Sequence, residues 1–234
     1  MNENEYWFYY HIDLEDGQRA HFRIILDPET LTMVSDAVGP HPVWTKLFYN
    51  QCQCCPLSPH IHAFCPIAVN IADLVNRFKN ILSHKNCLVV CETMDRTYSK
   101  RTSAMEGLTS IFGIIMATSD CPVMNFLKPM ARFHLPFSSI EETTARSTSL
   151  FLLGQYFEYK KGRVKSFEFD RLEKNYAKVQ LVNEGLLARI RSLGKRDADK
   201  NAIITLHSLS QFLSVEMDFS LNSICGLFEK ARNG

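Results

Sequence analysis

Aromatic and β-branched residues alternate with polar ones at the start of the chain, which is typical of β-strands with one buried face. Two such runs cover residues 6–13 and 18–26, and Asp16-Gly17 between them is a strong turn signal. A third short strand is expected over 30–34, and the apolar run 87–92 predicts a buried strand. The pattern therefore predicts an N-terminal antiparallel hairpin or meander.

In the rest of the chain apolar residues recur every three or four positions, which predicts helices. Ser139, followed three positions later by Glu142, forms a capping box and predicts where one long helix begins. Three prolines interrupt 118–138, so a loop is expected there. The predicted helices cover 43–49, 67–82, 104–117, 139–159, 172–193, 203–213 and 221–228.

These elements predict an α+β fold. A β-rich portion over 1–138 carries a cysteine-rich loop, and a mainly helical portion covers 139–234. No low-complexity tract or linker separates the two, so we expect them to pack as one domain.

Charge and hydropathy narrow the possible partners. The 26 Lys and Arg residues nearly balance the 25 Asp and Glu residues, which argues against strong nonspecific binding to nucleic acid. The best apolar stretch, 108–117, is too short to cross a membrane, and the acidic residues 1–5 do not resemble a secretory signal. We therefore expect a cytoplasmic protein, in which the eight cysteines serve as thiols or metal ligands.

Four of the cysteines fall between residues 50 and 66. Cys52 and Cys55 form a C-x-x-C pair, whose short loop lets two thiolates converge on one ion. Cys65 and Cys121 are each followed by proline, as is Cys55, and proline turns the chain stiffly away from the sulfur. Pro66 suits the first position of the helix that follows, which would make Cys65 its N-cap and favour a thiolate there.

Two ligand sets are compatible with this pattern. Cys52, Cys55, Cys65 and Cys121 would give four sulfurs, suited to zinc or an iron–sulfur cluster. The first three with His60 or His62 would give a Cys₃His site, which favours structural zinc. Ordinary buried thiols are the alternative to a metal site, and a metal-free C-x-x-C redox pair is less consistent with the pattern.

Basic residues suggest a second kind of site. Arg96, Lys100 and Arg132 could bind an anion if their loops meet. His134 is the best general base, with Arg132 and Lys128 near it in sequence, so an enzyme acting on a small anionic substrate is an alternative function. Incidental surface charges are the more common explanation of such a pattern. The sequence motifs of P-loop, dinucleotide-binding, zinc-protease and serine-hydrolase sites do not occur.

Five segments share a distinctive sequence pattern: 52–57, 65–70, 96–100, 116–122 and 128–137. Together they resemble an uncharacterised bacterial family, a domain of unknown function. The resemblance extends over nearly the whole chain and implies a bacterial cytoplasmic protein, but it implies no activity, cofactor or site residue.

The leading hypothesis is thus a metal-binding protein with zinc or an iron–sulfur cluster. The second is the enzyme described above. The third is a noncatalytic interaction protein that binds a partner or forms a homo-oligomer through its amphipathic C-terminal helices.

Overall fold

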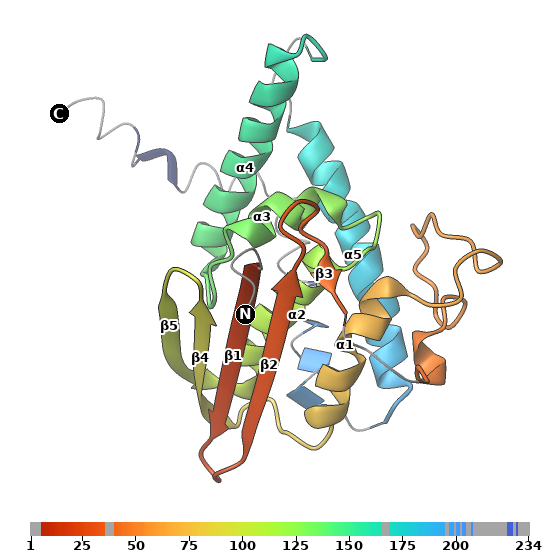
Figure 1. Ribbon diagram of the computed structural model, residues 1–234, viewed down its shortest axis with the longest axis vertical. Coiled ribbons are helices and arrows are strands. Elements are labelled where there is room, and N and C mark those ends of the chain that lie inside the picture. Colours follow the sequence, from red (N-terminus) through yellow and green to blue (C-terminus); the bar gives the residue numbers. More distant parts are fainter. Residues whose placement is uncertain are drawn as a thin grey trace.

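The computed structural model describes residues 6–35, 40–164, 169–194, 197–198, 200–201, 203–204, 207, 224–226 and 228. Within these residues five strands form one antiparallel sheet in the order β3-β2-β1-β4-β5 (Figure 1). The strands are β1 (Tyr6–Leu14), β2 (Arg19–Leu26), β3 (Met33–Val34), β4 (Asn86–Thr93) and β5 (Thr97–Ser103).

Buried and partly exposed side chains alternate along β1, which gives the sheet one buried face. Phe8, Tyr10 and Ile12 are fully buried, whereas the residues between them keep partial exposure. The turn from β1 to β2 has Gly17 at φ 85°, a left-handed conformation that glycine adopts without strain. Tyr10 pairs with Phe22 on β2 and with Cys91 on β4, so apolar side chains of three strands share this face.

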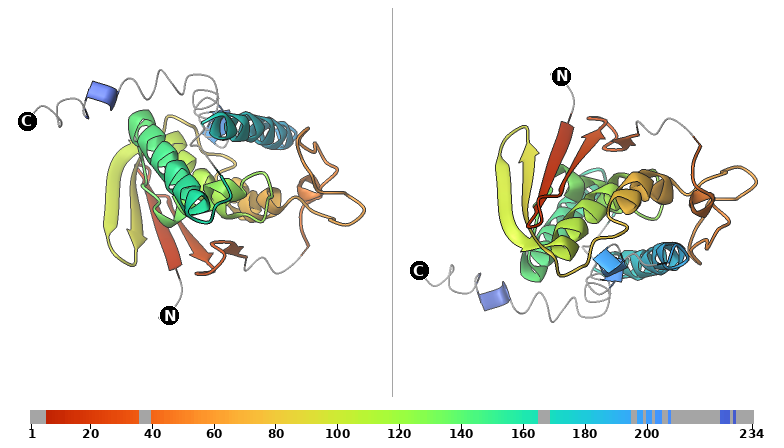
Figure 2. Two further views of the ribbon diagram at one scale, coloured as in Figure 1. Left: turned by 90° about the horizontal axis from the view of Figure 1, so that it is seen from above. Right: turned by 90° about the horizontal axis from the view of Figure 1, so that it is seen from below.

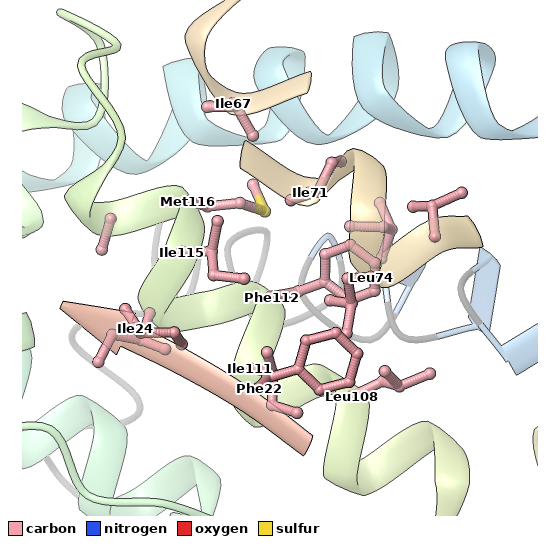
Figure 3. Packing of buried hydrophobic residues seen from close by; sticks show 14 of the residues in the cluster. Phe22, Ile24, Ile67, Ile71, Leu74, Leu108, Ile111, Phe112, Ile115 and Met116 are labelled. Atoms are coloured by element: carbon pink, nitrogen blue, oxygen red, sulfur yellow. The ribbon is translucent and has the colours of Figure 1, made fainter. Parts of the chain in front are cut away.

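The helices between residues 66 and 191 cover this face of the sheet, as the views from above and below show (Figure 2). Two of them, α1 (Pro66–Arg77) and α2 (Ala104–Thr118), carry the apolar side chains that meet the sheet. Figure 3 shows Phe112 and Leu74, from α2 and α1, near Phe22 of the sheet. Because a Cβ at Gly107 would lie 2.8 Å from the Val89 Cγ2 atom, glycine there lets α2 approach β4 closely.

Three further helices complete the layer: α3 (Lys128–Arg132), α4 (Ile140–Lys160) and α5 (Asp170–Arg191). The 3-10 turns η1 (Val43–Thr45) and η2 (Asn125–Leu127) lie in the connections. The capping box of Ser139 and Glu142 forms as predicted and begins α4. Helix α5 runs beside the segment 43–65, which forms a projecting loop (Figure 1).

The α+β class and the order of sheet first and helices second are confirmed. Strand β5 was missed, because most of its side chains are polar and exposed at the edge of the sheet. The predicted helix 43–49 is only a 3-10 turn, the one from 67 ends at Arg77 rather than 82, and the loop 118–138 contains η2 and α3. The helices predicted over 203–213 and 221–228 lie largely outside the described residues. Buried residues of both portions, such as Phe8 and Val179, belong to one hydrophobic cluster.

Candidate functional site

Four cysteines from three separate segments line one small cavity of about 20 Å³. Cys52 and Cys55 come from the projecting loop, Cys65 from the start of α1, and Cys121 from the turn after α2. These are the four sulfur ligands that the sequence predicts. Apolar side chains fill most of the remaining lining, including Leu47, Leu57, Ile67, Val182 and Leu186.

Backbone hydrogen bonds connect Cys65, at the end of the projecting loop, to the beginning of that loop. Lys46 and Phe64 form an isolated antiparallel bridge, and the Cys65 N–H donates to the Thr45 carbonyl at 2.8 Å. Cys65 is the N-cap of α1 and Pro66 occupies its first turn, as predicted. A thiolate at this position would face the positive end of the helix dipole.

The C-x-x-C pair is a tight turn in which the Cys55 N–H donates to the Cys52 carbonyl at 3.0 Å. Burial is the largest cause that raises the pKa of the Cys52 thiol, and the other causes are all neighbouring thiols: Cys55, Cys54, Cys121 and Cys65. This mutual effect shows that the predicted ligands lie close enough to sense each other's charge.

Cys121 lies just after α2 and is buried. Burial raises the pKa of its thiol to about 11, with a contribution from Cys65 and Cys55. The backbone N–H groups of Val123 and Met124 act in the opposite direction and lower this pKa. Such donors stabilise a thiolate and are typical of the surroundings of metal-bound sulfur.

Arg189 on α5 is a buried cation next to these thiols. Its Nη1 donates to the carbonyls of Trp44 and Lys46, at 2.5 Å and 2.8 Å, and its Nη2 donates to that of Leu47 at 3.0 Å. Burial lowers the pKa of Arg189, and the thiols of the cavity act against this effect. Arg189 therefore fastens the projecting loop to α5 and offsets negative charge on the sulfurs.

Gly185 lets the loop approach the same helix. A Cβ at this position would lie 3.0 Å from the Cys52 Cβ and 3.2 Å from its Cα. Sequence reasoning overlooked both Gly185 and Arg189, which lie inside a regular amphipathic helix. An arginine on the apolar side of the helix, three positions after Leu186, was the available signal.

The structure does not bring His60 or His62 to the cysteine cavity, as the Cys₃His ligand set would require. His60 and His62 are exposed and do not line the cavity. The four predicted ligands, Cys52, Cys55, Cys65 and Cys121, form no disulfide bonds. In the described part of the chain, no group of three or more His, Cys, Asp or Glu side chains is already arranged to hold a metal ion. The four thiols thus share a cavity without being drawn around a common centre.

The structure separates His134 from the predicted basic residues. His134 lines a second, larger cavity of about 460 Å³, to which Arg132, Lys128, Arg96 and Lys100 do not contribute. Arg132 stacks on the Tyr6 ring at 4.0 Å, the Lys128 Nζ donates to the Thr32 hydroxyl at 2.7 Å, and Lys100 pairs with Glu106. Arg96 is exposed at the turn between β4 and β5.

The surroundings of His134 at the larger cavity determine its hydrogen bonds and its protonation state. Its Nε2 lies 2.6 Å from the Tyr10 hydroxyl and 3.5 Å from the Ser110 hydroxyl. Burial, assisted by the charge of Arg146, lowers the pKa of His134 to about 3. The imidazole is therefore neutral at physiological pH and accepts a proton poorly, which does not favour it as a general base.

In the described part of the C-terminal half, several exposed apolar side chains lie near the end of α4. Leu153, Tyr156, Phe157 and Tyr159 are exposed near the end of α4. The homo-oligomer predicted from the amphipathic helices stays a prediction. In the described part of the chain, no helix combines the length and apolar character needed to cross a bilayer.

A family model described as a domain of unknown function (DUF6901) matches residues 8–229. The chain belongs to this family. The match extends over almost the whole chain and confirms the predicted resemblance to an uncharacterised family. No curated protein and no solved structure matches the chain. The four cysteines, Gly185 and Arg189 all lie inside the part that matches DUF6901.

Proposed function

We propose that this protein binds zinc through Cys52, Cys55, Cys65 and Cys121. The observation that carries the proposal is the shared cavity, because cysteines from three segments of the chain line it. A four-cysteine set is typical of structural zinc sites. The ion would draw the four sulfurs to about 2.3 Å from its centre, which requires rotation of the cysteine side chains from their present positions.

The size of the cavity favours a single ion. About 10–15 Å³ are needed to hold one water molecule, and this cavity of about 20 Å³ is only slightly larger. An iron–sulfur cluster adds several iron and sulfide atoms, which need more space than one ion. A cavity of about 20 Å³ leaves no room for a substrate beside the ion, so the role we propose for zinc is structural.

The surroundings also fit the charge of the site. Four thiolates around a Zn²⁺ ion carry a net negative charge in a buried place. The Arg189 guanidinium and the N–H groups of Val123 and Met124 compensate part of it. Without an ion, burial and the neighbouring thiols raise the pKa values of Cys52 and Cys121, which keeps these two thiols protonated.

Elemental analysis of protein purified without air or chelators tests the proposal. We expect a colourless protein with one zinc per chain. We expect Cys121→Ser to lose most of the zinc, because its sulfur comes from a segment that no other ligand can replace. Cys54→Ser is the matched control, since Cys54 lies in the same loop but does not line the cavity.

Three results would contradict the proposal. Metal-free protein that folds normally would exclude a structural ion. A brown protein containing iron and sulfide would show that the cysteines hold a cluster instead. Equal loss of zinc from Cys54→Ser and Cys121→Ser would show that the ligand set is different.

A further inference from the structure

The larger cavity is chemically distinct from the cysteine site. It lies between α2, α3, α4 and α5 and has a volume of about 460 Å³. Small-molecule sites usually have volumes of about 300–1,000 Å³, so this cavity has the size of a ligand site. Four methionines, Met105, Met116, Met124 and Met130, are among its lining residues. Methionine side chains adapt to apolar ligands of irregular shape.

One charged group among the lining residues lacks an acidic partner. The Arg146 Nη2 donates to the carbonyls of Met130 and Phe133, at 3.2 Å and 2.8 Å, which fixes the guanidinium at the end of α3. Among the described residues, no carboxylate forms an ion pair with Arg146. Glu142, the acid whose charge acts on the pKa of Arg146, instead accepts from the Ser139 N–H at 2.7 Å in the capping box. The acid that lines the cavity, Glu106, is paired with Lys100 and Thr102 instead.

Neutral hydrogen-bonding groups accompany Arg146. The Tyr10 hydroxyl contacts both the His134 Nε2 and, at 2.9 Å, the Ser110 hydroxyl. Burial raises the pKa of Tyr10 well above its ordinary value, so its hydroxyl keeps its proton. Neutral His134 carries one ring N–H, and the hydroxyls of Tyr10 and Ser110 each carry one O–H. Arg146, His134 and Ser110 thus provide donors on one cavity that is otherwise mainly apolar.

We propose that this cavity binds an amphipathic carboxylic acid, with the carboxylate on Arg146 and the hydrocarbon body among the methionines. Guanidinium groups match carboxylates in geometry and charge. At roughly 30 Å³ for each water-sized group, the cavity has room for about fifteen heavy atoms. Straight-chain acids of about ten to twelve carbons fit this volume.

The head-group preference of the wild-type protein tests the proposal. Displacement of the neutral fluorophore N-phenyl-1-naphthylamine would be measured with decanoate, 1-decanol and decyltrimethylammonium, each below its micelle concentration. We expect decanoate to bind at least tenfold more tightly than the alcohol, and the cation to bind most weakly. Equal binding of decanoate and decanol, tightest binding of the cation, or no saturable binding of decanoate would overturn the proposal.

Two arginine variants test whether Arg146 is the residue that binds the carboxylate. Arg146→Gln should remove the preference for decanoate and leave decanol binding within twofold. Arg132→Gln is the matched control, because Arg132 is exposed on α3 and does not line the cavity. A decanoate preference unchanged in Arg146→Gln, or lost equally in the control, would show that Arg146 does not bind the acid. If Arg146→Gln fails to fold, the wild-type head-group series decides the proposal.

Discussion

At the residue scale, the cysteine site depends on a glycine that carries no chemistry of its own. Gly185 is the point where the Cys52 backbone touches α5. A methyl group at 3.0–3.2 Å from the Cβ and Cα of Cys52 would be closer than ordinary packing allows, and these atoms cannot move without the backbone. The absence of a side chain at Gly185 therefore sets how closely the Cys52 part of the projecting loop approaches α5.

We expect Gly185→Ala to displace the loop and weaken zinc binding. The stability of the folded chain should fall by roughly 1–3 kcal/mol, as overpacking usually costs this much. Zinc affinity from competition with a chromophoric chelator and a denaturant titration would measure the two effects.

Gly154→Ala on α4 is the matched control. A Cβ there meets no atom within 4 Å, so alanine should stabilise the helix by about 0.4–1 kcal/mol. Gly185→Ala that matches this control in both stability and zinc affinity would show that the loop does not need the glycine.

Arg189 is the second residue on which the site depends. Its guanidinium donates to three carbonyls of the segment 44–47 and is buried. Arg189→Met keeps much of the side-chain volume but leaves those carbonyls unpaired, at a cost of about 1–3 kcal/mol for each buried group left unsatisfied. It also removes the cation beside the thiols.

We therefore expect Arg189→Met to be less stable than the wild type and to bind zinc less tightly at neutral pH. A denaturant titration and chelator competition would measure both. Arg163→Met, which removes an exposed arginine paired with Glu158, should change neither by more than a few tenths of a kcal/mol. Unchanged zinc affinity in Arg189→Met would mean that the cation does not compensate the thiolates.

At the element scale, the close contact of α2 with β4 fixes where Cys121 lies. Cys121 follows the end of α2, and Gly107 lies near the beginning of the same helix against Val89. Because α2 is continuous between them, its packing on the sheet determines the position of the fourth sulfur. Ser103 begins the helix by accepting a hydrogen bond from the Glu106 N–H.

Gly107→Ala should lower the free energy of unfolding by roughly 1–3 kcal/mol, because its methyl group would overlap the Val89 side chain. The free energy of unfolding in urea would measure this. The double variant Gly107→Ala with Val89→Ala provides the control, since the second substitution makes space for the new methyl group. The cost of the glycine substitution should then be smaller in the Val89→Ala background, and an equal cost in both would show that the contact is not responsible.

At the scale of the whole molecule, zinc would connect the sheet-packed helices to the projecting loop. The four sulfurs come from three segments: the projecting loop, the start of α1 and the turn after α2. An ion bound only by the folded state stabilises it by mass action. We expect removal of zinc with a strong chelator to lower the melting temperature, and added zinc to restore it. A melting temperature unaffected by chelation would exclude a structural ion.

Proton release should accompany zinc binding. Burial raises the pKa of Cys121 to about 11 and that of Cys52 further, so these thiols are protonated at neutral pH. Zinc binds thiolates, and therefore Cys52 and Cys121 each lose a proton when the ion enters. Zinc affinity should rise with pH between 6 and 8, and calorimetry in buffers of different ionisation enthalpy should show release of at least about two protons per ion at about pH 7. Binding without proton release would mean that thiols are not the ligands.

The metal-free chain should respond to alkaline pH in the opposite direction. A group whose folded pKa is raised contributes stability below its unfolded pKa and loses it as pH rises through the folded value. Cys121, and also Cys87 with a pKa raised to about 11 by burial, should therefore destabilise the metal-free protein as pH rises from about 9 to 11. Denaturant midpoints across this range would measure the loss, and Cys87→Ala should reduce its extent.

The sequence by itself determined the local features of this protein. Alternating residues predicted β1, β2 and the turn at Gly17, and the capping box predicted the beginning of α4, because these signals act between near neighbours. The four cysteines were chosen by the same local reasoning, from the C-x-x-C spacing and the prolines after the other two.

Only the tertiary structure decided what surrounds those features. In the sequence, Gly185 and Arg189 are ordinary positions of a helix, and their roles are visible only where α5 lies against the loop. Strand β5 is likewise recognised only from its hydrogen bonds to β4. The same is true of Arg146, whose place on a cavity depends on three other helices. Packing between distant segments determines close approach, burial and charge compensation, and none of these follows from local spacing in a single chain.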